Sequence, residues 1–216
     1  MRVVKFALFI TLWFSGNSMA EEIKYKAIKQ EGQIEFRKYE TVVSAEVQVS
    51  GDRREAATKA FRILVQYING QNNAEERIPM TAPVSQLAVS SDRRVSPNMK
   101  KDRTQLPSSN IGVSSITDNA WKVMFYMPPN MSLEKTPSPS DKRITIRKVD
   151  ALEVAVIRFS GSGSHKNLEE HTQKLLSYLN KHNYQYKPNP RYAFYNPPYI
   201  PFFLRRNEVM LELEGI

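Results

Sequence analysis

Short stretches in which apolar and polar residues alternate recur along the chain. Between residues 44 and 49, Ala45, Val47 and Val49 alternate with polar side chains. The same alternation occurs at 34–37, 121–127 and 208–213. Because successive side chains of a β-strand point to opposite faces, this pattern predicts strands with one buried and one more polar face.

Two other stretches follow the period of an α-helix. In the first, apolar residues recur at i, i+3, i+4, i+7 and i+11: Ala57, Ala60, Phe61, Leu64 and Ile68. Asp52 and Glu55 have the spacing of a capping box, and Gly70 is a typical helix stop. The second helix carries a comparable stripe: Leu168, Thr172, Leu175, Leu176 and Leu179. Many short strands with two helices, each covering part of a sheet, indicate an α+β fold.

The chain contains an internal repeat. Residues 33–39 resemble residues 143–149, each is followed by a second strand pattern, and a Ser-Gly pair and a helix come next. Arg37 and Arg147 are offset by 110 positions, as are Gly51 and Gly161. The repeat predicts two copies of a strand–strand–helix–strand unit in one domain, with halves at about 21–89 and 120–216.

The segment 90–119 separates the two halves. It is polar, has no clear period, and contains the basic pairs Arg93-Arg94 and Lys100-Lys101. We interpret it as a solvated hairpin insertion, and the alternative is a basic flap over a binding site.

The first twenty residues have the pattern of a secretory signal peptide. Arg2 and Lys5 precede the apolar stretch 6–14, which is too short to span a bilayer. Ser18-Met19-Ala20 then places small residues at the cleavage positions. We predict cleavage after Ala20 and a mature protein, residues 21–216, that is periplasmic or secreted.

The amino-acid composition excludes several kinds of functional site. The chain of 216 residues has no cysteine, which excludes disulfides, cysteine-ligated zinc, iron–sulfur clusters and a cysteine nucleophile. The formal net charge is +9 and falls to +7 once Arg2 and Lys5 are removed. The basic residues are scattered, and no nucleic-acid-binding motif accompanies them. The charge therefore favours an anionic small molecule or contact with an envelope surface, and we predict no nucleic-acid partner.

Several motifs, in order along the chain, resemble the SOUL haem-binding protein family. They are 34–39 (IEFRKY), 61–72 followed by 78–84 (IPMTAPV), 137–141, 195–198 (YNPP) and 206–209 (RNEV). The resemblance implies a distorted eight-stranded antiparallel β-barrel flanked by two helices and built from two pseudo-symmetric halves. It also implies non-enzymatic, non-covalent binding of haem or a related tetrapyrrole in a hydrophobic cleft beside the first helix, as a carrier or buffer.

Haem is a flat apolar ring with two propionates, so a site needs an apolar slot and a basic edge. The candidate cofactor-binding residues are Phe61, Arg62, Leu64, Val65, Ile68, Met80, Arg205 and Arg206. In some relatives a histidine precedes the tyrosine of the IEFRKY block, whereas this chain has Lys38 there. No axial ligand is therefore assigned, and the three histidines, His165, His171 and His182, have no metal-ligand spacing. The aromatic, proline-rich stretch 192–203 would either wall a ligand or cap the core.

Two alternatives stay open. Related half-barrels occur in bacterial effector-binding domains, so the chain could be a general binding module for amphipathic anionic small molecules. A hydrolase is the other alternative, for which Glu208 is the best carboxylate, because related domains can carry a pocket glutamate. No catalytic motif is present in the sequence, and we assign no catalytic residue.

Overall fold

The computed structural model describes residues 20–89 and 120–214. The predicted signal peptide and the insertion 90–119 lie outside the described residues. Two α-helices and eleven short strands make up the described part, which confirms the predicted α+β class. The helices are α1 (Arg53–Ile68) and α2 (His165–Lys181), and two short 3-10 turns are η1 (Leu133–Lys135) and η2 (Phe202–Leu204).

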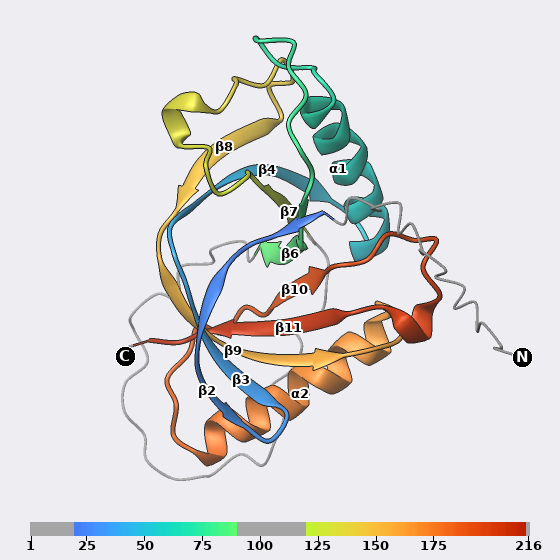
Figure 1. The fold of residues 1–216 in the computed structure, drawn as a ribbon. Coiled ribbons are helices and arrows are strands. Elements are labelled where there is room, and N and C mark those ends of the chain that lie inside the picture. The colour runs from blue at the N-terminus through green and yellow to red at the C-terminus, as the bar shows by residue number, and fades with distance from the viewer. Residues whose placement is uncertain (1–19, 90–119, 215–216) are drawn as a thin grey trace, which may run out of the picture.

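Nine strands form one antiparallel sheet that curls into a half-barrel (Figure 1). In spatial order they are β2 (Tyr25–Glu31), β3 (Ile34–Tyr39), β9 (Leu152–Phe159), β11 (Asn207–Glu212), β10 (Arg191–Phe194), β6 (Val84–Val89), β7 (Ala120–Tyr126), β4 (Val42–Ser50) and β8 (Ile144–Val149). The resemblance implied eight strands. The ninth is β2, an edge strand of mostly exposed residues that shows no alternation to predict it. Outside this sheet, β1 (Glu21–Glu22) pairs in parallel with β5 (Thr81–Ala82).

The two repeats exchange their first strands. β3 pairs with β9 of the second repeat, while β8 pairs with β4 of the first. The two halves meet where β10 pairs with β6, and the strand order on one side of this seam mirrors the order on the other. β7, which follows the insertion, pairs with β4 and β6. The two halves of the sheet therefore do not coincide with residues 21–89 and 120–216, because β7 lies in the half of the sheet that contains β4 and β6.

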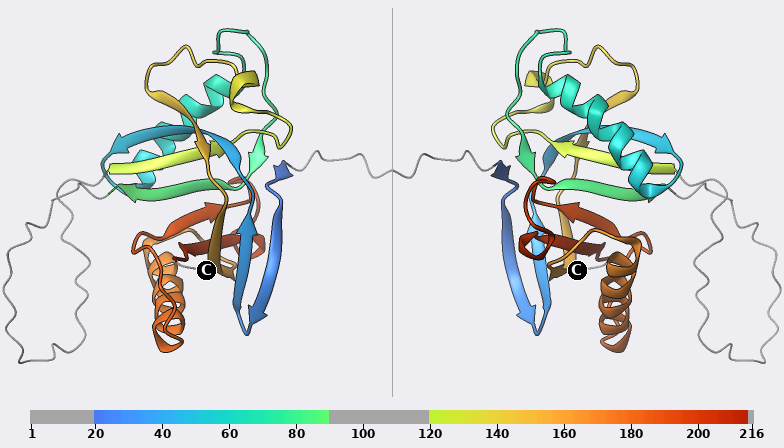
Figure 2. Two further views of the ribbon diagram at one scale, coloured as in Figure 1. Left: turned by 90° about the vertical axis from the view of Figure 1, so that its left-hand side faces the viewer. Right: turned by 90° about the vertical axis from the view of Figure 1, so that its right-hand side faces the viewer.

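Both helices cover the same face of the sheet. α1 packs on β4 and β7 around Leu64, and α2 packs on β9 and β11 around Leu175. Tyr192, Gln86 and Val123 are cross-strand neighbours that link the two cores across the seam, so they point to one face. Figure 2 shows the helices beside the two halves of the sheet. The opposite face, called here the second face, carries Ser44, Glu46, Ser85, Arg191, Met210 and Glu208.

The turn from the second strand into the helix is equivalent in both repeats. Gly51 follows β4 with φ +121° and Gly161 follows β9 with φ +109°. L-residues with a side chain rarely adopt this conformation, which explains why glycine stands at both places. Asp52 then caps α1, accepting a hydrogen bond of 2.9 Å from the backbone N–H of Arg54, as the sequence predicts. α1 ends at Ile68, just before Gly70.

Candidate ligand-binding site

One flank of α1 presents apolar side chains to solvent. Phe61 is 38% exposed and packs its ring edge-on against Phe125 of β7, with ring centroids 5.3 Å apart. Val65, four residues later on the same side of the helix, is partly buried. Met80 is 39% exposed. The backbone N–H of Ile78 donates to the Ile68 carbonyl at 2.8 Å, so the segment leading to Met80 returns along the end of α1.

Two of the predicted contact residues belong to the core instead. Leu64 is fully buried and Ile68 is 6% exposed, both in the cluster formed with β4 and β7. They lie on the same helical line as the buried Ala60, which points at the sheet, so neither reaches the surface. Arg62 is exposed on the outer side of α1. Of the predicted apolar slot, Phe61, Val65 and Met80 therefore remain.

The two C-terminal arginines are already engaged. Arg205 donates to the carbonyls of Ile200 and Pro198 and holds the loop before β11. Arg206 pairs with Glu208 at 2.8 Å and with Glu22 of β1 at 2.8 Å, and its guanidinium lies 3.7 Å from the centre of the Tyr195 ring. The contacts of Arg206 tie the C-terminal loop to the N-terminal strand and match its charge with two carboxylates, whereas the hydrogen bonds of Arg205 go to backbone carbonyls.

Arg37 and Glu208 form a buried ion pair on the second face. Arg37 Nη1 lies 2.8 Å from Glu208 Oε2, and Nη2 lies 3.1 Å from Oε1. The exposed fraction of the two side chains is 2% and 0%. Arg37 also donates to Glu35 at 2.6 Å, and Tyr195 Oη donates to Glu208 at 2.8 Å. The first and the last of the sequence motifs, IEFRKY and RNEV, thus meet in one network.

This network keeps Glu208 charged. Burial raises the pKa of the Glu208 carboxyl, but the hydrogen bonds and charge of Arg37 and the charge of Arg206 outweigh burial, so the pKa is lowered. Burial also raises the pKa of Tyr39, which borders the network, to about 12. An enclosed carboxylate that already accepts bonds from two arginines is poorly suited to take a proton from a substrate. Glu208 therefore links β11 to β3 through Arg37.

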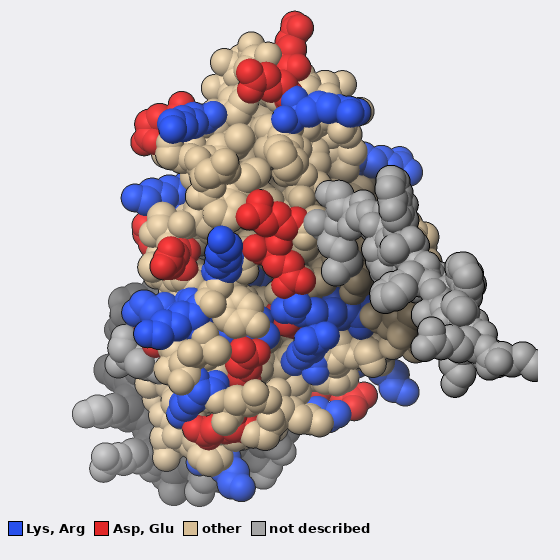
Figure 3. Space-filling model, viewed as in Figure 1, with Lys and Arg blue, Asp and Glu red and all other residues tan. Residues whose placement is uncertain are grey.

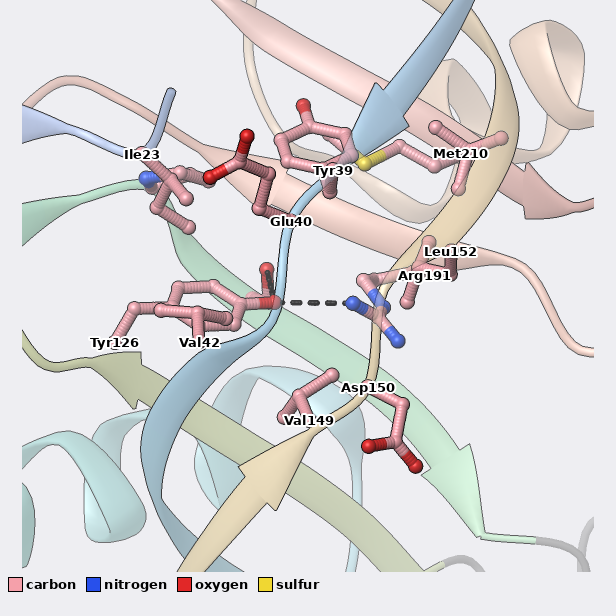
Figure 4. A pocket seen from close by; sticks show the side chains of 13 residues that line it. Ile23, Tyr39, Glu40, Val42, Tyr126, Val149, Asp150, Leu152, Arg191 and Met210 are labelled. Atoms are coloured by element: carbon pink, nitrogen blue, oxygen red, sulfur yellow. Dashed lines mark hydrogen bonds between the residues drawn. The ribbon is translucent and has the colours of Figure 1, made fainter. Parts of the chain in front are cut away.

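A cavity that the sequence did not indicate lies on the second face, between the β3–β4 and β8–β9 connections (Figure 4). Its apolar lining includes Val42, Leu152 and Met210. Arg191 of β10 reaches into it and donates to Tyr126 Oη at 3.1 Å, and Tyr126 donates to Ser85 at 3.0 Å. β10 has only four residues, too few for a periodic pattern, which is why sequence analysis did not single out Arg191.

A larger hollow adjoins this cavity. It has a volume of about 420 Å³ and shares Ile23, Glu40 and Val42 with the cavity. Its other lining residues come from β1, β4, β5, β8 and the segment after β7, and the apolar ones among them include Met127, Pro128, Met131 and Leu133. Ile23, the residue after β1, thus forms part of the wall of both spaces, and Glu22 of β1 lines the larger one.

The histidines offer no metal site. His171 Nδ1 lies 2.7 Å from the Asn167 carbonyl oxygen, and its ring stacks on Phe159 with centroids 4.0 Å apart. His165 begins α2 and His182 caps its end. Within residues 20–89 and 120–214, no group of three or more histidine, aspartate or glutamate side chains is arranged to hold a metal ion.

The aromatic C-terminal loop is not part of the core. Tyr199, Phe202, Phe203 and Leu204 are between 59% and 82% exposed. Of the two interpretations of the stretch 192–203, capping of the core is wrong for Tyr199, Phe202 and Phe203, whereas Tyr192 is buried in the core beside α2. Figure 3 shows the surface in the view of Figure 1, where basic and acidic side chains are interspersed rather than gathered by sign.

The family model described as SOUL heme-binding protein matches residues 20–212, nearly the whole chain. The chain belongs to the SOUL heme-binding protein family. This confirms the resemblance seen in the motifs. No curated protein matches this SOUL chain significantly.

Solved structures share the fold. The C-terminal domain of EcmrR has a TM-score of 0.59 at 10% identity, covering 85% of this SOUL chain and 98% of that domain. A hydrolase encoded by lin2189 from Listeria innocua has a TM-score of 0.54 at 8% identity, covering 84% and 91% of the two chains. An uncharacterized conserved protein from Listeria innocua has a TM-score of 0.55 at 9% identity, covering 84% and 92%. At these identities the likeness concerns the fold alone.

Among the described residues, neither helix is long and apolar enough to cross a bilayer.

Proposed function

We propose that this SOUL-family chain binds haem or a related tetrapyrrole non-covalently on the apolar flank of α1, without catalysing a reaction. The observation that carries the proposal is the exposure of Phe61 on this flank in a chain whose family model spans residues 20–212. Neighbouring apolar side chains that remain accessible are a feature of binding surfaces, and Phe61 and the partly buried Val65 are neighbours on this flank. Phe61, Val65 and Met80 supply the apolar contacts.

The residues present suit a tetrapyrrole. The face of the ring would pack against Phe61 and Val65, while Arg62, the next residue on the exposed side of α1, supplies a positive charge for a propionate. The Met80 thioether, 39% exposed, is the side chain of this set that could ligate haem iron. Bound haem would supply an iron centre, and the flank itself supplies apolar contact and charge.

A carrier or buffer role outside the cytoplasm completes the proposal. We propose that the leader is removed after Ala20 and that the mature protein is periplasmic or secreted. β1 begins at Glu21, so this cleavage would leave every described strand in place. The engaged state of Glu208 supports a binding role over hydrolysis, because its oxygens already accept bonds from Arg37, Arg206 and Tyr195.

A hemin titration of the mature protein tests this proposal. We expect a shifted Soret band that saturates at about one equivalent of hemin, with micromolar or tighter affinity. Iron-free protoporphyrin IX serves as the matched probe for the contribution of iron ligation. Failure to see a saturable shift with either compound at micromolar concentrations would refute tetrapyrrole binding.

A further inference from the structure

We propose that the loop 199–204 and a basic hollow beside it form a docking surface for a lipid bilayer that contains anionic phospholipids. The loop would place its apolar side chains just below the lipid headgroups, and the arginines of the hollow would bind lipid phosphates. The apolar flank of α1 takes no part, so this inference does not rest on tetrapyrrole binding. Three observations carry it: the exposure of the loop, its fixed backbone, and the charge of the hollow.

The loop exposes four large apolar side chains. Tyr199 is 82% exposed, and Phe202, Phe203 and Leu204 are 59%, 61% and 65% exposed. The last three form the 3-10 turn η2 just before β11 (Figure 1), and successive side chains of such a turn point about 120° apart. A rigid protein surface would cover only part of this turn, whereas fluid lipid can surround all three side chains. Aromatic and leucine side chains are typical of segments that lie in the membrane interface.

Hydrogen bonds hold the backbone of the loop in place. The Phe202 carbonyl accepts from the backbone N–H of Gly161 at 3.0 Å, which ties η2 to the turn after β9. The guanidinium of Arg205 donates to the carbonyls of Pro198 and Ile200. The apolar side chains are thus held outward before any lipid binds, which lowers the entropic cost of docking.

A basic hollow adjoins the loop. It has a volume of about 440 Å³ and is lined by Leu204, Arg158, Arg205 and Arg206, and its other lining residues are uncharged. Guanidinium groups bind phosphate oxygens through paired hydrogen bonds. Because Leu204 belongs both to the hollow and to η2, a phosphate bound here would lie beside the side chains that enter the lipid. A phospholipid joins phosphate and acyl chains in the same way.

Part of the positive charge of the hollow has no carboxylate partner. Arg206 pairs with Glu22 and Glu208, but Arg205 makes its hydrogen bonds with backbone carbonyls. Arg158 is exposed and forms no ion pair within residues 20–89 and 120–214. Its cross-strand neighbour Glu208 is fully buried and already shared with Arg206. Arg158 and Arg205 therefore supply charge that an anionic lipid surface attracts.

Flotation with lipid vesicles tests the proposal on residues 21–216, the predicted mature chain, because the apolar stretch 6–14 could itself bind lipid. We expect binding to vesicles of phosphatidylcholine and phosphatidylglycerol to be about tenfold tighter than to phosphatidylcholine alone, and to weaken in high salt. Phe202→Ser combined with Phe203→Ser should weaken binding about tenfold or more. The matched control is Leu133→Ser, on an exposed leucine of η1, which should leave the affinity within about twofold.

Arg158→Gln tests the contribution of the hollow. It should weaken binding to the mixed vesicles about fivefold and leave binding to phosphatidylcholine unchanged. The matched control is Arg77→Gln, which removes an equally exposed charge near the end of α1, whereas the start of α1 contacts the turn after β9 through Arg53 and Gly163. This variant should retain wild-type binding to both kinds of vesicle within about twofold.

A label on the loop locates the contact without any of these variants. Because the chain has no cysteine, Tyr199→Cys and Leu133→Cys each accept an environment-sensitive dye at one position. The mixed vesicles should shift the emission of the dye at position 199 to shorter wavelength and leave that at position 133 unchanged.

Four results would overturn the proposal. They are equal binding to both kinds of vesicle, unchanged binding after the two serine substitutions, a dye shift at position 133 without one at 199, and absence of vesicle binding. In the last case, a dimer in sedimentation equilibrium that the serine substitutions abolish would assign the loop to a second copy of this chain. The hemin titration contains no lipid, so the two proposals can fail separately.

Discussion

At the scale of single residues, the most consequential contact is the ion pair between Arg37 and Glu208. The two residues are 171 positions apart, and the strands that carry them, β3 and β11, both pair with β9. The exposed fraction of each side chain is 2% or less, and Glu208 is the buried counter-charge of Arg37, whose other partner, Glu35, is 26% exposed. Removing one partner of such a pair leaves a buried charge uncompensated, which is costly.

Glu208→Gln should therefore destabilise the protein strongly. The change keeps the size of the side chain but leaves Arg37 and Arg206 without their shared counter-charge. We expect the free energy of unfolding to fall by about 3 kcal/mol or more, measured by urea denaturation at pH 7. Glu170→Gln, which breaks an exposed pair with Lys174 on α2, is the control and should have little effect. Equal stability of Glu208→Gln and wild type would contradict the structural role of this pair.

The same pair predicts a pH dependence. The pKa of Glu208 is lower in the folded protein than in the unfolded chain, where it is about 4.3. The carboxylate thus stabilises the fold above the unfolded pKa, and this contribution disappears as the pH falls through the folded pKa. The difference in unfolding free energy between wild type and Glu208→Gln should be constant from about pH 5 to 7 and shrink below about pH 4. A difference that does not shrink in acid would contradict the lowered pKa.

Sequence patterns predicted some of these residues and could not predict others. Local spacing predicts the cap at Asp52. It also places Phe61 in one apolar stripe with Leu64, whereas Phe61 is 38% exposed and the buried face of the helix includes Ile63 and Tyr67 instead. The burial of Leu64 and Ile68 follows from the same helical spacing once it is known which face of the helix packs on the sheet. The partner of Glu208 and the cavity position of Arg191 depend on strand pairing between distant segments, which no local period records.

At the scale of elements, the strand-to-helix turns show how closely the two repeats correspond. Gly51 and Gly161 both have positive φ, and a capping side chain comes after each, Asp52 directly and Ser164 three residues later. At Gly161 an added Cβ would also lie 3.3 Å from Asn167 Nδ2, which donates to the Ser162 carbonyl. At Gly51 the space for a Cβ is open.

Alanine at either glycine should therefore destabilise the protein through the backbone. We expect a loss of about 1 kcal/mol or more in unfolding free energy for Gly51→Ala, and a larger loss for Gly161→Ala because Asn167 must also move. The neighbouring exposed serines supply controls: Ser50→Ala and Ser160→Ala should be nearly neutral. Denaturant titration measures all four variants, and unchanged stability of both glycine variants would contradict the equivalence of the turns.

The strands were less predictable than the helices. β2 escaped prediction because its side chains are mostly exposed, so no apolar alternation is needed to hold it beside β3. β1 and β5 have two residues each, which is too short for any pattern. The repeat predicted the order of elements within each unit, but the exchange of β3 and β8 between the halves is a property of the sheet and not of either sequence copy.

At the scale of the whole molecule, this exchange makes the halves interdependent. β9 of the second repeat pairs with β3 of the first, and β4 of the first repeat pairs with β8 of the second. The fragments 20–89 and 120–214 should each be unfolded alone and regain the native circular dichroism spectrum when mixed, because each lacks strands that complete its sheet. A fragment that folds cooperatively by itself would contradict the exchanged topology.

Tetrapyrrole binding on the α1 flank is tested by comparing hemin binding to three variants by the Soret shift. We expect Phe61→Asp to weaken hemin binding at least tenfold. Phe203→Asp, the same change on an exposed phenylalanine of the C-terminal loop, and His171→Ala should leave the affinity within about threefold. Wild-type affinity in Phe61→Asp, or loss of binding in either of the other two variants alone, would contradict this location of the site.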